Sequence, residues 1–384
     1  MFLKLNYQMQ IRKKTIPVLS PAGGKEEINA IAKTIKSGWW GRGAQVEELE
    51  KKFAKLIGTK YAVTTLSNTT GLDLVLKAYG INSGNIISPT VSWVTTAMVP
   101  LWNNCENRLC DINPKDRNLC PKDVKKLIDK NTKAIISVNY AGIQCNTKPL
   151  RKFFKGLIIE DCALSCYTPG AGKSGDVAIW SFQAVKTISC GDGGIITTNS
   201  KKLYKKLKSL TYFGISQDTY KRATVKGKKS LLKPGYVWDF DVKSVGYKAY
   251  MNDLQASMLL AQLKKLKSFV KRRLQIQKFY NDSLPKEIGK PEYSGTCQFY
   301  SASVKKEYRS ELMEFLAKKK IHTTVHYKPL HLHPVFKQKR KFPIADDEWK
   351  KFISFPCHAA MTLKDAKYIV YYVKKFFDKK NKKV

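Results

Sequence analysis

The chain has 384 residues, 43% of them hydrophobic, which is enough for a large buried core and predicts one large domain with a smaller one. Lysine and arginine total 70 against 30 acidic residues, a formal net charge of +40. The sequence contains no run of about 18 consecutive apolar residues, so we expect no membrane span, and residues 1–15 lack a signal-peptide pattern. We therefore expect a cytoplasmic protein.

The positive charge raises nucleic acid as a partner. Lysine greatly outnumbers arginine and is spread along most predicted helices, whereas proteins that read bases and phosphates usually cluster arginine. We interpret the basic stretches 221–229 and 373–383 as solvated surface, which would also attract a doubly negative small ligand. A basic nucleic-acid-binding protein on a degenerate enzyme fold stays as the alternative from another class.

The predicted elements follow an N-terminal arm, residues 1–15. Apolar spacing predicts one helix over about 26–35 and a second over about 46–56, each ending at a glycine signal. Between them lies the glycine- and aromatic-rich loop 39–43, WWGRG. The nine cysteines that follow have no zinc or disulfide spacing and predict buried free thiols.

From Tyr61 the chain alternates short β-rich runs with helical stretches, for example 69–79 and 121–129. This alternation predicts an α/β sheet covered by helices on both faces. The predicted strands are 61–66, 85–89, 107–112, 133–139, 157–160, 178–182 and 194–198.

After about residue 250 the pattern changes to a long helix, 253–281, a strand over 298–304 and helices near 305–319 and 362–378. We place the domain boundary near 245–255. The prediction is a large α/β domain over 16–250 and a smaller C-terminal α+β domain over 251–384.

Four segments with polar or aromatic side chains lie just past predicted strand ends, where open α/β sheets form their sites. They hold Ser67, Asn68, Thr69 and Thr70; Trp93; Asp161; and Lys186. Each residue alone could be a helix cap, a core residue or a surface lysine. Their combination is what indicates a site.

Pyridoxal 5′-phosphate has four needs that these residues fill. Lys186 supplies an amine for a Schiff base, and Asp161 supplies a carboxylate for the ring nitrogen. The hydroxyls and N–H groups at the helix start 67–70 suit a phosphate, and Trp93 offers an aromatic face for the ring.

The chain resembles the DegT/DnrJ/EryC1/StrS family of sugar aminotransferases, a branch of the fold type I pyridoxal-phosphate enzymes, from about Ile16 to residue 376. The most specific marker is GDVAIWSFQAVKTISCGDGGIITT (175–198), which holds Lys186. The other markers are SGWWGRGAQVEELE (37–50), IIEDCALS (158–165), VGYKAYMNDLQAS (245–257) and TTVHYKPLHLHP (323–334).

The resemblance implies the role of each matched residue. Lys186 would be the Schiff-base lysine and Asp161 the partner of the ring nitrogen, with Trp93 stacked on the ring. The remaining cofactor residues would be Ser67, Asn68, Thr69, Thr70, Ser181 and Gln183, with the phosphate on backbone N–H groups of Thr69 and Thr70. The residues at the sugar would be His326, Tyr327, Trp40 and Arg42.

Three positions depart from the family pattern. Asn68 stands where the family commonly has glycine, between Ser67 and Thr69. Leu164 replaces a Gln or His, which weakens the carry-over of a hydrogen bond to the ring hydroxyl. Tyr250 stands where Asn or Arg is common, which puts the cross-subunit phosphate contact in doubt.

The resemblance also implies a reaction. Related sugar dehydratases carry histidine in place of Lys186, so the lysine favours amino transfer. We expect L-glutamate to convert the cofactor to pyridoxamine 5′-phosphate, which then aminates C4 of UDP- or dTDP-4-keto-6-deoxyglucose in a homodimer with shared sites. A C3-specific aminotransferase of the same family is the alternative. His331 and His333 have no third ligand nearby, so no metal is expected.

Overall fold

The computed structural model describes residues 9–215, 219–220, 240–291 and 295–382. The predicted basic stretch 221–229 and most of the predicted N-terminal arm lie outside the described residues. Among those that are described, no helix is long and apolar enough to cross a membrane.

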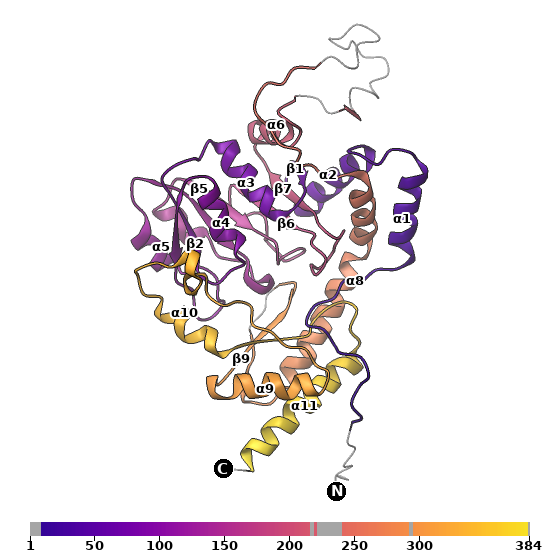
Figure 1. Cartoon of the computed structure of the whole chain (residues 1–384), viewed down its shortest axis with the longest axis vertical. Helices are drawn as coiled ribbons and strands as arrows, with labels where there is room; N and C mark the ends of the chain where they lie inside the picture. Colours follow the sequence, from indigo (N-terminus) through magenta and orange to yellow (C-terminus); the bar gives the residue numbers. More distant parts are fainter. Residues whose placement is uncertain (1–8, 216–218, 221–239, 292–294, 383–384) are drawn as a thin grey trace.

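The large sheet has seven strands in the order β1-β7-β6-β5-β4-β2-β3 (Figure 1). All neighbours from β6 to β3 are parallel, while β7 runs antiparallel to both β6 and β1. The carboxyl ends of the parallel strands therefore meet at one edge. The strands are β1 (Tyr61–Thr65), β2 (Asn85–Pro89), β3 (Glu106–Cys110), β4 (Thr132–Val138), β5 (Leu157–Asp161), β6 (Val177–Ser181) and β7 (Gly194–Thr198).

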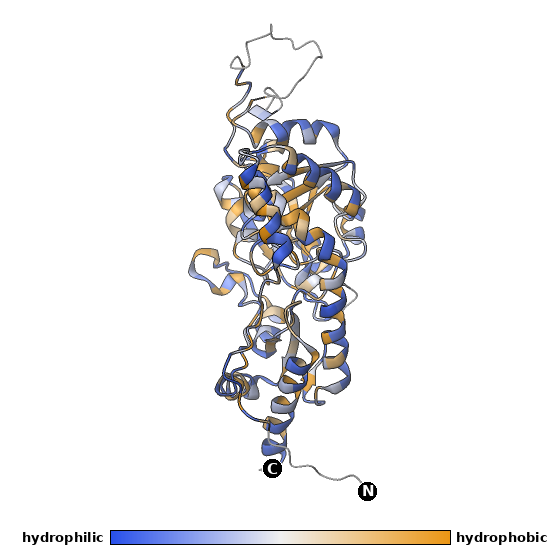
Figure 2. Ribbon diagram, turned by 90° about the vertical axis from the view of Figure 1, so that its right-hand side faces the viewer, coloured by the Kyte–Doolittle hydropathy of each residue, from blue (hydrophilic) through white to orange (hydrophobic). Residues whose placement is uncertain are grey.

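Helices cover this sheet, and Figure 2 shows the apolar strands enclosed between them. They are α1 (Lys25–Lys36), α2 (Ala44–Ile57), α3 (Asn68–Tyr79), α4 (Thr95–Trp102), α5 (Pro121–Leu127) and α6 (Lys201–Leu210), with short 3₁₀ turns η1 (Tyr140–Gly142) and η2 (Lys148–Lys152). The predicted α/β sheet covered on both faces is confirmed. Gly58 and Gly80 end α2 and α3 in the left-handed conformation that glycine adopts at least cost.

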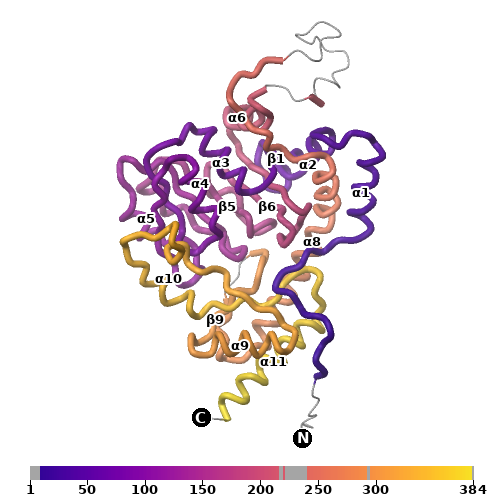
Figure 3. Tube along the Cα trace, in the orientation of Figure 1, coloured from indigo at the N-terminus to yellow at the C-terminus, as the bar shows by residue number. Residues whose placement is uncertain are grey.

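The C-terminal part is built on a small antiparallel sheet of order β10-β9-β8. Its elements are β8 (Ile288–Gly289), β9 (Tyr300–Val304), α9 (Lys306–Lys318), η3 (Leu330–Leu332), η4 (Pro334–Phe336), α10 (Pro343–Glu348), η5 (Trp349–Lys351), β10 (Phe352–Phe355) and α11 (Leu363–Asn381). Figure 3 shows the N-terminal segment passing alongside this part. Ile16, which the prediction assigns to the large domain, pairs with Ile321 and packs in the C-terminal core.

Helix α8 (Asp253–Ser283) runs through both parts of the molecule (Figure 1). Near its start, Leu259 packs in the core that holds α2 and β6, and near its end Tyr280 packs in the core around β9 and α11. Asp253, its first residue, accepts hydrogen bonds from the N–H groups of Gly43 and Val46 at the start of α2. The helix thus fixes the C-terminal part to the large sheet.

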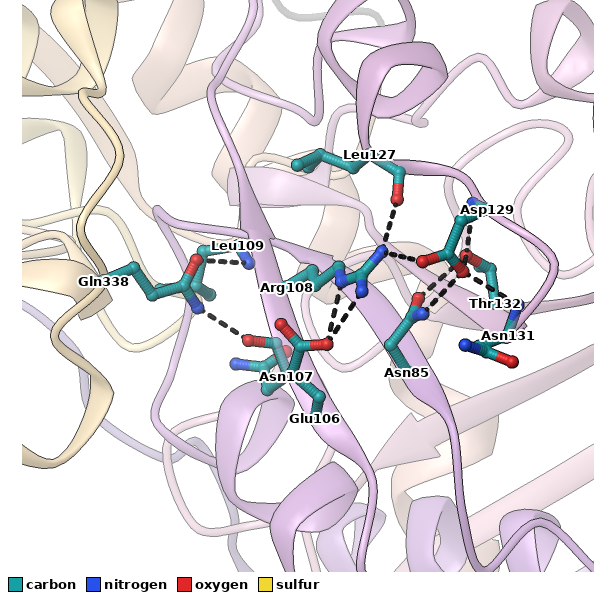
Figure 4. Close-up of polar contacts among 10 residues, drawn as sticks. All are labelled: Asn85, Glu106, Asn107, Arg108, Leu109, Leu127, Asp129, Asn131, Thr132 and Gln338. Atoms are coloured by element: carbon teal, nitrogen blue, oxygen red, sulfur yellow. Dashed lines mark hydrogen bonds and ion pairs between the residues drawn. The ribbon is translucent and has the colours of Figure 1, made fainter.

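The C-terminal part also covers the edge of the large sheet at β3 (Figure 4). The Gln338 amide accepts from Leu109 N at 3.2 Å and donates to Asn107 O at 2.6 Å, and Arg340 donates to Leu109 O. Arg108 on the same strand forms ion pairs with acidic neighbours. These side chains form hydrogen bonds with backbone groups of β3 that an edge strand would otherwise offer to another chain.

Candidate active site

A pocket of about 500 Å³ lies at the carboxyl ends of β5 and β6, between the large sheet and the segment before β10. It brings together most of the predicted site residues from both parts of the chain: Ser67, Asn68, Thr69, Trp93, Asp161, Ser181, Gln183, Lys186, His326 and Tyr327.

Asp161 ends β5 at the floor of this pocket and is 5% exposed. Burial raises the pKa of its carboxyl, and three neighbours oppose that shift. Ala163 N and Asn68 Nδ2 each donate to its Oδ1 at 3.0 Å, and the charge of Lys186 acts in the same direction. These interactions favour the charged carboxylate, which is the form that holds a protonated ring nitrogen.

Lys186 lies in the turn after β6, where its N–H donates to Gln183 O at 2.9 Å. Burial lowers the pKa of its amine to about 8, and the Asp161 carboxylate opposes the shift. An amine in this range is neutral often enough near pH 7 to attack a carbonyl and to carry protons.

The start of α3 forms one end of the pocket. Ser67 caps the helix, with its Oγ accepting from Thr70 N at 3.0 Å. Thr70 does not line the pocket of the described chain, and its N–H donates to the Ser67 cap. The predicted contact between Thr70 and the phosphate stays a prediction. Ser67 and Thr69 do line the pocket, beside the N–H groups that a first helical turn leaves free.

Asn68, the departure from glycine, has a role that the sequence did not reveal. Its side chain is buried and joins the start of α3 to Asp161 and, at 3.3 Å, to Ile179 O. The Asn68 amide therefore orients the Asp161 carboxylate from the first residue of α3.

Aromatic rings also line the pocket. Trp93 is 62% exposed and lies 6.0 Å from the ring of Tyr327, which is half-buried. His326 stacks on Phe299 with ring centroids 4.0 Å apart, and its Nδ1 lies 2.9 Å from Ser354 Oγ. Burial, with the nearby Lys186 charge, lowers the pKa of His326 to about 3, so its ring is neutral.

Two predicted sugar residues, Trp40 and Arg42, lie away from this pocket in the described chain. The loop that holds them folds against α2 and α8. Arg42 is buried and pairs with Glu50 at 3.2 Å, while Trp40 is 55% exposed and donates its Nε1–H to Ile35 O. The ion pair explains why Arg42 does not reach the pocket of its own chain.

The remaining positions that the sequence singled out have local contacts. Leu164 lines the pocket as an apolar residue. Tyr250 packs against Tyr212 at 5.0 Å. His331 bonds through its two ring nitrogens to Thr90 and Asp346 and stacks on a phenylalanine, as a structural histidine does.

Several pocket residues were missed from the sequence. Thr324 and Val325 could have been found from their place beside His326, whereas Gln298 and Phe299 had no signal beyond a strand pattern. The missed lining residues are Leu19, Ser92, Thr95, Val138, Ala163, Val185, Asp192, Gln298, Phe299, Thr324 and Val325.

The donor set fits pyridoxal 5′-phosphate. It combines a buried carboxylate, a lysine of lowered pKa, a helix start with a hydroxyl cap and an exposed aromatic face. This site, at the carboxyl edge of a seven-stranded mixed sheet with a smaller C-terminal part, defines a fold type I pyridoxal-phosphate-dependent transferase.

The chain belongs to the DegT/DnrJ/EryC1/StrS aminotransferase family, whose profile matches residues 21–374. It is 32% identical to the uncharacterized protein MJ1066 of Methanocaldococcus jannaschii over 95% of this chain and 98% of that one. It is 30% identical to the spore coat polysaccharide biosynthesis protein SpsC of Bacillus subtilis over 92% and 95%. The PLP form of the putative sugar aminotransferase Spr1654 from Streptococcus pneumoniae superposes with a TM-score of 0.84 at 26% identity, covering 95% of this chain and 99% of that one. The chain is therefore a pyridoxal-phosphate-dependent sugar aminotransferase.

Proposed function

We propose that this enzyme moves an amino group from L-glutamate to C4 of a nucleoside-diphosphate 4-keto-6-deoxy sugar. UDP- or dTDP-4-keto-6-deoxyglucose would give the 4-amino-4,6-dideoxy product. The observation that carries the proposal is the Lys186–Asp161 pair in a pocket open to a large substrate. The segment VHYKPLHLHP (325–334), which resembles the C4-acting branch, supports the choice of carbon.

Each protein group has a part in this reaction. Bound pyridoxal phosphate supplies an electron sink for the carbon that loses its proton. Lys186 would hold the cofactor through its amine and would carry that proton, since its pKa of about 8 suits a base and an acid near neutral pH. Asp161 would hold the proton on the ring nitrogen of the cofactor, and Asn68 donates a hydrogen bond that keeps the carboxylate in place.

The sugar would lie on the aromatic side of the pocket. His326 is neutral and bonds to Ser354 through Nδ1, which leaves Nε2 to meet a sugar hydroxyl. Tyr327 presents its hydroxyl and ring from the same segment. The strongly basic surface would raise the local concentration of a nucleotide diphosphate.

A homodimer that shares residues between its two sites is part of the proposal. Trp93, at the pocket, and Trp40, in the predicted substrate loop, are both more than half exposed in the single chain. Large exposed aromatic side chains are typical of surfaces that a partner covers. Trp40 would then serve the site of the other subunit. A cytoplasmic location also remains a prediction.

The decisive experiment offers the enzyme L-glutamate with a panel of UDP- and dTDP-linked 4-keto and 3-keto sugars. Formation of 2-oxoglutarate measures turnover, and NMR of the product gives the aminated carbon and its stereochemistry. Lys186→Ala, which removes the amine, is the control and should abolish turnover. Amination at C3, or turnover only with other amino donors, would contradict the proposal.

A further inference from the structure

Gln298 makes contact with the chain on both sides of Lys186. It lies just before β9 and is 1% exposed. Its Nε2 donates to Val185 O at 2.7 Å, and its Oε1 accepts from Thr187 Oγ1 at 2.8 Å. One planar amide therefore fixes the residue before Lys186 and the residue after it.

The backbone N–H and C=O groups of Gln298 are both hydrogen-bonded. Its N–H donates to Ala141 O at 2.9 Å, and its C=O accepts from Arg273 Nη1 at 2.7 Å. Arg273 belongs to α8, is 1% exposed and also donates to Cys357 O at 2.7 Å. The backbone that carries the Gln298 side chain is thus hydrogen-bonded to the long helix that joins the two parts of the molecule.

The position of the Lys186 amine depends on the backbone that carries it. Its long side chain has many rotamers, so a shift of the turn moves the amine relative to Asp161 and to the substrate. A misplacement of about 1 Å in a catalytic group can cost roughly 100-fold in rate. Contacts that fix residues 185 and 187 can therefore affect the reaction rate more than the strength of the hydrogen bonds alone would suggest.

We propose that Gln298 is a positioning residue for Lys186, acting from the C-terminal part of the chain. The proposal rests on the role of Lys186 in the proposed function. Only a carboxamide both donates to Val185 and accepts from Thr187 in one plane. Glutamate cannot donate, and leucine can do neither, although both have a similar size.

The test uses the purified holoenzyme and four variants: Gln298→Leu, Thr187→Val, Thr187→Ser and Gln277→Leu. Gln277 is a buried glutamine of α8 whose Oε1 has no hydrogen-bond partner in the described part of the chain, so it controls for the loss of a buried amide without the two bonds of Gln298. The readouts are the rate constant at saturating glutamate and the apparent Kd for glutamate in the single-turnover half-reaction, thermal stability, and the pH at which the visible absorbance of the lysine-bound cofactor titrates.

Gln298→Leu should lower the saturating rate constant roughly 10- to 100-fold with little change in the apparent Kd for glutamate, and should shift the pH of the absorbance change. Thr187→Val, which removes one of the two bonds, should show a smaller loss of the same kind, and Thr187→Ser, which keeps the hydroxyl, should restore the wild-type values. Gln277→Leu should change thermal stability without moving the absorbance titration.

Equal effects of Gln298→Leu and Gln277→Leu on every readout would overturn the proposal, since they would show only a loss of packing. So would a Thr187→Val variant identical to wild type. Measurements on the wild-type enzyme distinguish a failure of the Gln298 proposal from a failure of the proposed function. If the wild type aminates a keto-sugar and the variants do so equally well, only the Gln298 role is refuted. If the wild type holds no lysine-bound cofactor, both proposals are refuted.

Discussion

The lowered pKa of Lys186 can be tested directly in the apoprotein. Burial lowers this pKa from its ordinary value of 10.5 to about 8. At pH 7 an amine with a pKa near 8 is about 9% neutral, whereas one near 10.5 is about 0.03% neutral, so the neutral fraction of Lys186 should be roughly 300 times larger than the ordinary value allows. Competitive labelling with a trace of acetic anhydride over a series of pH values, read peptide by peptide by mass spectrometry, gives the pH midpoint at which Lys186 loses its proton.

The Asp161→Asn variant tests the second part of the reasoning. The Asp161 carboxylate stabilises the charged amine, so its removal should lower the pKa of Lys186 further and move the labelling midpoint below that of wild type. The exposed Lys36 in the same digest corrects for reagent and pH. A labelling midpoint for Lys186 close to 10.5, or a rise in the variant, would refute burial as the dominant effect.

Three further predictions concern stability. Asp253→Ala removes the acceptor for N–H groups at the start of α2 and should cost about 2 kcal/mol in urea unfolding, whereas a loss below about 0.5 kcal/mol would contradict the capping role. Gly194→Ala would place a Cβ 2.5 Å from Ser67 O, so we expect a loss of about 1–3 kcal/mol and weaker cofactor binding by titration of the apoprotein; unchanged binding would argue against coupling to the helix start. Burial lowers the pKa of His358 from 6.5 to about 4, so the unfolded chain takes up the proton first and stability should fall as the pH drops from 6.5 to 4. In His358→Gln the melting temperature should fall less over this pH range. An equal fall in the variant and the wild type would contradict the prediction.

Local patterns predicted the main elements well. The apolar runs and glycine stops gave α1, α2 and all seven strands of the large sheet to within a few residues, because strand burial and helix termination depend on neighbours in the chain. The predicted run 107–112 is shifted by one or two residues from β3. The domain boundary near 245–255 stays a prediction, since α8 begins there and then belongs to both hydrophobic cores.

The candidate site was predicted where one rule applied: polar and aromatic residues just beyond the strand ends lie close together. Lys186, Asp161, Ser67 and Trp93 follow this rule, and the structure places them at one pocket. Arg42 was assigned from a resemblance of the loop, and its burial against Glu50 could not be read from spacing.

The sequence by itself determined the class of chemistry, because Lys186 and Asp161 are side chains with the required reactivity at the ends of two recognisable strands. Only the tertiary structure decided their electrostatics and their positioning. The pKa of Lys186 depends on burial by segments far away in the chain, and the amide of Gln298 contacts residues 185 and 187 across more than 100 positions. Such contacts leave no periodic pattern in the sequence, since they depend on how two separately formed parts pack together.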